Sequence, residues 1–188
     1  MYNGKMLSLL LLLFVFILSA CGANQAEPEK MTETEIVKEP KTDNTRAINV
    51  KLITSEKKLP QNIDEIAFKR QSVPYYEYLV MRAENEKDYE QIWKYYELTP
   101  NNYSVNFTEH DAYFIGVRES GSCPVDLGDV KINPEGTALT VHLRESGGTC
   151  TADATPRTFV IEVNRDEGEN IEEVIIVEGE TETAVPVI

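Results

Sequence analysis

Residues 112–150 form the stretch AYFIGVRESGSCPVDLGDVKINPEGTALTVHLRESGGTC. It contains three apolar-rich runs with strand-like alternation, at 112–118, 125–132 and 138–144. The segment Asn133-Pro134-Glu135-Gly136 predicts a tight turn between the second and third runs. If the three strands form an antiparallel meander, the first and the third run in the same direction.

Strand-like and helical patterns also occur on both sides of this stretch. Further strands are expected at 48–53, 76–81, 158–163 and 171–177. One helix is expected between the cap Asn85 and the segment Thr99-Pro100, with apolar residues at helical spacing: Tyr89, Ile92, Trp93 and Tyr96. We interpret this aromatic stripe as core packing rather than as a ligand platform. The sequence therefore predicts an α+β domain, with a mostly antiparallel sheet of about six to seven strands and one amphipathic helix.

The N-terminal segment resembles the signal peptide of bacterial lipoproteins. Met1 to Lys5 carries one positive charge, and an uncharged apolar run follows from Met6 to Ala20, too short for an ordinary membrane span. It ends in Leu18-Ser19-Ala20-Cys21-Gly22, which resembles a lipobox. The resemblance implies cleavage after residue 20 and a diacylglyceryl lipid on Cys21, which anchors the chain at the extracytoplasmic face of the cell membrane. The alternatives are a plain signal peptide with a chance cysteine, or an uncleaved anchor.

The composition divides the rest of the chain into two parts. Residues 21–46 are rich in Glu, Lys, Thr and Pro, so we expect a disordered acidic tether there. Residues 47–188 have the length of a single extracytoplasmic domain. The chain has a formal net charge of −14, and the acidic excess argues against a nucleic-acid partner.

A short motif recurs after the first and third runs: RESGSC at 118–123 and RESGGTC at 144–150. In a meander both copies lie at the same end of the sheet. With Cys21 assigned to lipid, Cys123 and Cys150 are the two remaining thiols, and we expect a disulfide between them. A redox pair usually has closer CxxC spacing, and a zinc site needs four ligands whereas His110 and His142 are the only histidines. We therefore expect no metal and no cofactor.

Three arginines are expected at the disulfide end of the sheet: Arg118, Arg144 and Arg157. Their guanidinium groups could form a fork for a carboxylate of a partner. The alternative is local neutralisation by the nearby acids Glu119, Glu145 and Asp153.

Residue types of a catalytic triad occur, but no motif frames them. His110-Asp111 with Ser120 or Ser122 could serve a small extracytoplasmic hydrolase, yet no nucleophile elbow surrounds either serine. Residues 166–170 have the oxygen ligands of a calcium loop without its spacing, and we expect a solvated hairpin turn there.

The order of elements over residues 84–177 resembles the C-terminal domain of the protease-complex subunit PrcB and related secreted bacterial domains. The resemblance lies in a helix with Trp93, then Val105-Asn106-Phe107, a strand ending in Gly116-Val117, and a late strand beginning Pro156-Arg157. The Gly-Gly-Tyr turn of that family is replaced here by Ser120-Gly121-Ser122-Cys123, and the paired cysteines are a further departure. The resemblance implies a small binding domain that accompanies an exported partner, and it implies no catalytic residue. The predicted function is a membrane-anchored binding module for a secreted or envelope protein, with the His110 hydrolase as the alternative.

Overall fold

The structure is a computed structural model and describes residues 44–188. The predicted signal peptide, Cys21 and nearly all of the predicted tether lie outside the described residues. Within the described part, no helix is long and apolar enough to cross a membrane.

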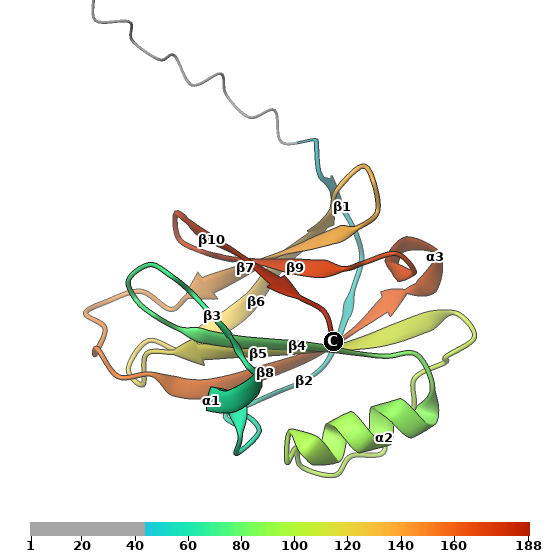
Figure 1. The fold of residues 1–188 in the computed structure, drawn as a ribbon, viewed down its shortest axis with the longest axis horizontal. Coiled ribbons are helices and arrows are strands. Elements are labelled where there is room, and N and C mark those ends of the chain that lie inside the picture. Colours follow the sequence, from blue (N-terminus) through green and yellow to red (C-terminus); the bar gives the residue numbers. More distant parts are fainter. Residues whose placement is uncertain (1–43) are drawn as a thin grey trace, which may run out of the picture. The chain divides into compact units, whose positions relative to one another are not determined.

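The described residues form a mostly antiparallel α+β fold, which confirms the predicted fold class (Figure 1). Within residues 44–188 the strands number ten rather than six or seven, and there are three short helices instead of one. The strands are β1 Arg46–Ala47, β2 Lys51–Glu56, β3 Phe68–Lys69, β4 Glu77–Ala83, β5 His110–Glu119, β6 Val125–Ile132, β7 Ala138–Glu145, β8 Thr155–Asn164, β9 Glu173–Glu178 and β10 Thr181–Pro186. The helices are α1 Ile63–Ile66, α2 Glu86–Tyr95 and α3 Arg165–Gly168.

The strands form two five-stranded sheets, in the orders β1-β6-β7-β9-β10 and β2-β8-β5-β4-β3. The predicted meander is wrong, because β5 and β6 belong to different sheets. Both faces of β5 are buried, and it pairs along its whole length with β8, far ahead in the sequence. Strand β7 pairs antiparallel with β6, as expected, and parallel with β9.

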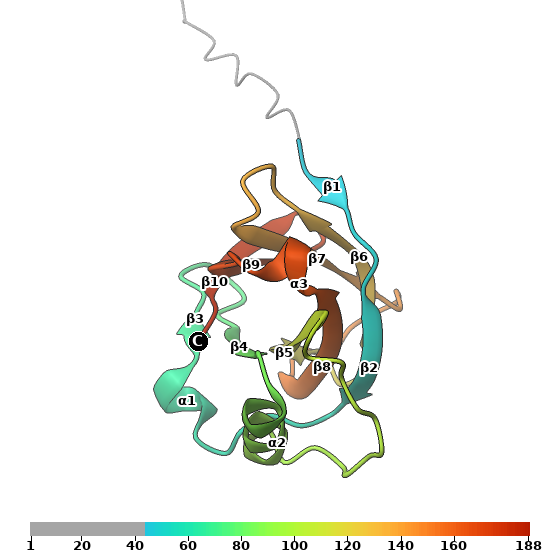
Figure 2. The same ribbon diagram turned by 90° about the vertical axis from the view of Figure 1, so that its right-hand side faces the viewer.

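The two sheets face each other, and the chain links them at both edges (Figure 2). At one edge β1 pairs with β6 and the chain continues directly into β2, which pairs with β8. At the other edge the C-terminal residues follow β10 and reach β4, where Ile188 N donates to Val80 O at 3.0 Å. These links leave little free sheet edge, which limits unwanted strand pairing.

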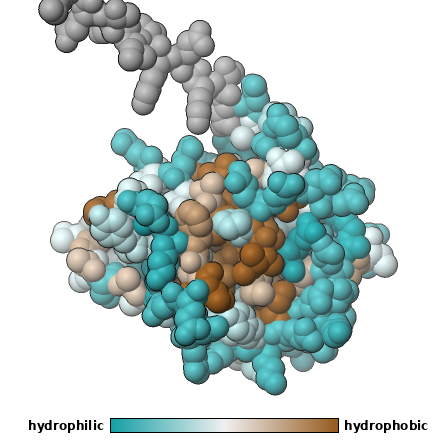
Figure 3. Space-filling view, in the orientation of Figure 1, coloured by the Kyte–Doolittle hydropathy of each residue, from teal (hydrophilic) through white to brown (hydrophobic). Residues whose placement is uncertain are grey.

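Alternation along β5 builds two cores. Tyr113, Ile115 and Val117 point between the sheets, whereas Ala112 and Phe114 point to the outer face. On that outer face they pack against α2. Figure 3 shows a separate group of apolar side chains in the middle of one face, around the C-terminus, where Ile188 is 58% exposed.

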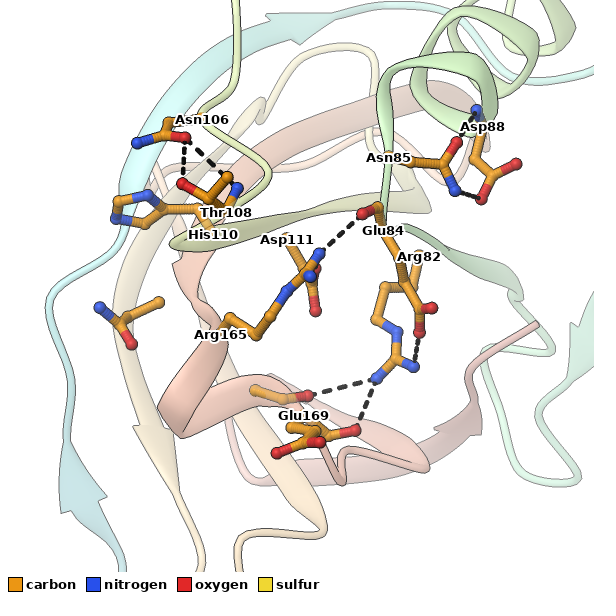
Figure 4. A network of polar contacts seen from close by, with 12 residues as sticks. Arg82, Glu84, Asn85, Asp88, Asn106, Thr108, His110, Asp111, Arg165 and Glu169 are labelled. Carbon is orange, nitrogen blue, oxygen red and sulfur yellow. Dashed lines mark hydrogen bonds and ion pairs between the residues drawn. The ribbon is translucent and has the colours of Figure 1, made fainter.

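Helix α2 begins where the sequence predicts. The Asn85 side chain accepts a hydrogen bond from Asp88 N at 3.0 Å, and its amide donates to the Asp88 carboxylate at 2.6 Å (Figure 4). The helix ends before Glu97, which has a φ of 55° and turns the chain back along the helix. The predicted hairpin turn at 166–170 is partly wrong, because α3 occupies its beginning, with the Asn164 side chain capping Asp166 N at 2.9 Å.

Candidate functional site

The cysteines are bonded as the sequence predicts. Cys123 follows β5 and Cys150 follows β7, with 5.4 Å between their Cα atoms. The cysteines are not brought together by the expected meander. Strands β5 and β7 lie in facing sheets, so the disulfide connects the two sheets at one end.

The predicted anion fork is not formed, because each of the three arginines is already paired with a carboxylate. Arg157 donates from Nε and Nη2 to Glu119, at 2.9 and 2.8 Å. Arg118 contacts Glu77 at 3.2 Å and Asp64 at 3.6 Å, and Arg144 pairs with Asp129. The alternative of local neutralisation holds, and of the three acids expected to supply it only Glu119 does so.

The triad residues are not brought together. His110 begins β5 whereas Ser120 and Ser122 follow its end, so at about 3.3 Å per residue they lie roughly 30 Å apart. The serines instead bond each other and Thr151 beside the disulfide. Among the described residues no cluster of three or more potential metal ligands occurs.

A groove of about 400 Å³ lies between α2 and the segment that returns along it, residues 97–103. Aromatic side chains form much of its wall, and carboxylates stand at its rim. The lining residues are Glu86, Tyr89, Glu90, Trp93, Lys94, Glu97, Leu98, Pro100, Asn101 and Tyr103. A concave surface of this volume with aromatic walls and a few polar groups is typical of ligand sites.

Local structure positions the groove's aromatic residues. Tyr89 and Trp93 are one helical turn apart, with ring centroids 5.4 Å apart, and both rings pack on Phe114 of β5. The Trp93 indole Nε1 donates to Thr99 O at 3.2 Å, which fixes the returning segment against the helix. The sheet thus holds the inner side of the wall rigid.

A polar cluster lies behind the wall. The Tyr103 hydroxyl donates to Glu162, a residue only 9% exposed on β8. Lys51, the cross-strand neighbour of Glu162, holds its ammonium 4.4 Å from the centre of the Tyr103 ring. Burial and the Glu162 carboxylate raise the pKa of the Tyr103 phenol above its ordinary value. The cluster therefore keeps Tyr103 protonated and oriented.

His110 lies beside Glu162 of this cluster. Figure 4 shows His110 next to Asn106 and Thr108. Its Nδ1 lies 3.2 Å from a Glu162 oxygen but makes no hydrogen bond of good geometry. Two other buried carboxylates differ: Asp111 and Glu119 each accept two hydrogen bonds from one arginine. Glu162 instead accepts its hydrogen bond from the Tyr103 hydroxyl.

The Tyr89 hydroxyl is the unsatisfied group of the groove. The residue is 95% buried, since its exposure is 5%, and its hydroxyl has no hydrogen-bond partner. Burial raises the pKa of this phenol, and Glu86, Tyr103 and Glu162 add to the shift. The hydroxyl oxygen is enclosed by the surrounding side chains, although Tyr89 itself lines the groove.

The comparisons with known proteins provide no family for this chain. No family model matches it, and no curated protein or solved structure matches it either. The groove must therefore be judged on its own chemistry.

The groove was not predicted from the sequence. Tyr89 and Trp93 were predicted as core, and they do pack on the sheet, but one side of each also lines the hollow. The available signal was the pair of acids Glu86 and Glu90 beside the stripe, with Asn101-Asn102-Tyr103 beyond the helix end.

Proposed function

We propose that this chain is a lipid-anchored extracytoplasmic binding module, and that the groove beside α2 is the surface that contacts its protein partner. The lipobox-like segment ending at Cys21 supports the anchor. The Cys123–Cys150 disulfide is compatible with an oxidising compartment outside the cytoplasm.

The observation that carries the binding role is the groove itself. It combines the aromatic residues Tyr89, Trp93 and Tyr103 with carboxylates at its rim. Aromatic side chains held rigidly are also the residue type that dominates binding energy at protein interfaces.

The residues that the hydrolase alternative requires do not meet, because His110 and the serines lie at opposite ends of β5. The resemblance to the PrcB domain stays a prediction, and it agrees with a binding role for an exported partner.

The test uses the full chain in its native membrane. A photoreactive amino acid replaces Glu90 at the groove rim or, as a control, Glu182 on the exposed face of β10. We expect a discrete crosslinked product from position 90 and none from position 182. Equal products from both positions, or none from position 90, would remove the groove as the contact surface.

The anchor is tested separately with Cys21→Ala. We expect an unprocessed precursor without lipid, which leaves the detergent phase on partitioning. A variant with normal mature mass that stays in the detergent phase would contradict lipidation at Cys21.

A further inference from the structure

We infer that the groove beside α2 binds a basic side chain, the ammonium of a lysine or the guanidinium of an arginine, presented by an exposed segment of the partner protein. This inference rests on the proposed function and specifies the chemistry that the groove recognises.

The aromatic wall suits the apolar stem and the charged end of such a side chain. A cation within about 6 Å of an aromatic ring centre is attracted to the face of the ring, most strongly to tryptophan. Tyr103 already shows this preference, because the Lys51 ammonium lies 4.4 Å from its centre. Trp93 is half-buried and lines the groove, so part of its surface is open to a ligand.

The rim carries an excess of negative charge. Its ionisable groups are the carboxylates of Glu86, Glu90 and Glu97 and the ammonium of Lys94. Glu97 accepts a hydrogen bond from Gln61 at 2.7 Å, whereas Glu86 and Glu90 form no ion pair within residues 44–188. They stand four residues apart on one helical face, where like charges repel. A cation between them relieves that repulsion.

The shape of the groove is the independent observation, since it is a hollow of about 400 Å³ between α2 and residues 97–103. An anionic ligand meets the rim carboxylates unfavourably, and a neutral apolar ligand leaves the carboxylates without partners.

The experiment uses the single tryptophan of the chain, Trp93, as the reporter. The full-length protein in detergent micelles is titrated with four capped tripeptides whose central residue is lysine, arginine, norleucine or glutamate, and Trp93 emission is recorded. We expect saturable binding of the lysine and arginine peptides, at least about tenfold tighter than that of the norleucine peptide. This selectivity should be lost at about 1 M salt, where the screening length is roughly 3 Å.

The matched variants are Glu86→Gln with Glu90→Gln at the rim, and Glu182→Gln on β10. The rim variant should weaken binding of the lysine peptide by about threefold to tenfold, the range for two exposed charge contacts. The β10 variant should bind as the unmodified protein does. Equal affinity for lysine and norleucine, tighter binding of glutamate, or an unaffected rim variant would each overturn the inference.

The results separate this inference from the proposed function. A crosslinked product from position 90 with no lysine selectivity would keep the groove as the contact surface and overturn its cation chemistry. Lysine-selective binding without any crosslinked product would overturn the partner contact while the cation chemistry stands.

Discussion

At the scale of single residues, the three arginines predicted to bind a ligand are paired with carboxylates of the fold itself. Glu119 is fully buried, and its carboxylate accepts hydrogen bonds from Arg157 and from Val125 N, at 2.9 Å or less, while Lys57 lies 3.8 Å away. Removing one member of a buried ion pair leaves the other charge uncompensated, which costs far more than losing an exposed pair.

Arg157→Ala is therefore expected to lower the free energy of unfolding by about 3–5 kcal/mol. The control Arg144→Ala removes an exposed pair with Asp129, with side-chain exposures of 65% and 58%, and should change it by less than about 1 kcal/mol. Urea unfolding of the two variants compares them directly. Equal effects would contradict a specific role for the buried pair.

Asp153 links the two loops beside the disulfide, because it accepts hydrogen bonds from Thr151 and from Gly121 N. These bonds favour the ionised carboxylate, and its pKa lies below the ordinary value of 3.8. The stabilisation is thus fully present above pH 3.8 and is lost as the pH falls through the lower pKa of the folded protein. Hydrogen exchange at Gly121 should accelerate in that acid range beyond the intrinsic pH effect. In Asp153→Ala this additional acceleration should be absent, and its persistence would assign it to another group.

At the scale of elements, α2 reaches the sheet because β5 carries a glycine at the contact. A Cβ at Gly116 would lie 2.5 Å from the end of Leu59 and 3.2 Å from the ring of Tyr96. Tyr96 is completely buried, and its hydroxyl donates to Leu79 O at 3.0 Å.

Gly116→Ala should therefore destabilise the fold by about 1–3 kcal/mol through overpacking. Because Leu59 can shift more easily than Tyr96, combining the variant with Leu59→Ala should show non-additive free energies of unfolding. Additive values would mean that the added methyl group meets another neighbour.

The sequence predicted most of the long elements, because their burial is periodic. The bounds of β6 match the predicted run, and α2 begins at the predicted cap. The hairpin strand β10 was missed because only Thr183 and Val185 point inward, and one of these is polar. The two-residue strands β1 and β3 are too short to show an alternation of apolar and polar residues. The assignment of β5 and β6 to one sheet failed because local alternation does not specify the partner strand.

The groove could not be predicted from the periodicity of the sequence either. The stripe on α2 satisfies the period of a core-facing helix, so nothing local marks one side of Tyr89 and Trp93 as open. The opposite wall, residues 97–103, shows no periodic pattern of apolar residues. Its position is set by the turn at Glu97 and by the hydrogen bond from Trp93 to Thr99.

At the scale of the whole domain, the disulfide connects two sheets that the chain already links at both edges. Its cysteines are 27 residues apart, and a closed loop of that length contributes about 3–4 kcal/mol in the chain-entropy model. Cys123→Ala with Cys150→Ala should lower the free energy of unfolding by that amount. Reductant should lower that of the unmodified protein similarly and leave the variant unaffected. A response of the variant to reductant would contradict the assignment.

The proposed partner covers the rim of the groove in the native membrane. Carboxyl labelling with a carbodiimide and glycine amide, read by mass spectrometry, tests it on the full-length protein in membranes and after purification. We predict that Glu86 and Glu90 are protected in membranes and react after purification, while Glu182 reacts equally in both. Equal labelling of Glu86 and Glu90 in the two states would contradict the claim.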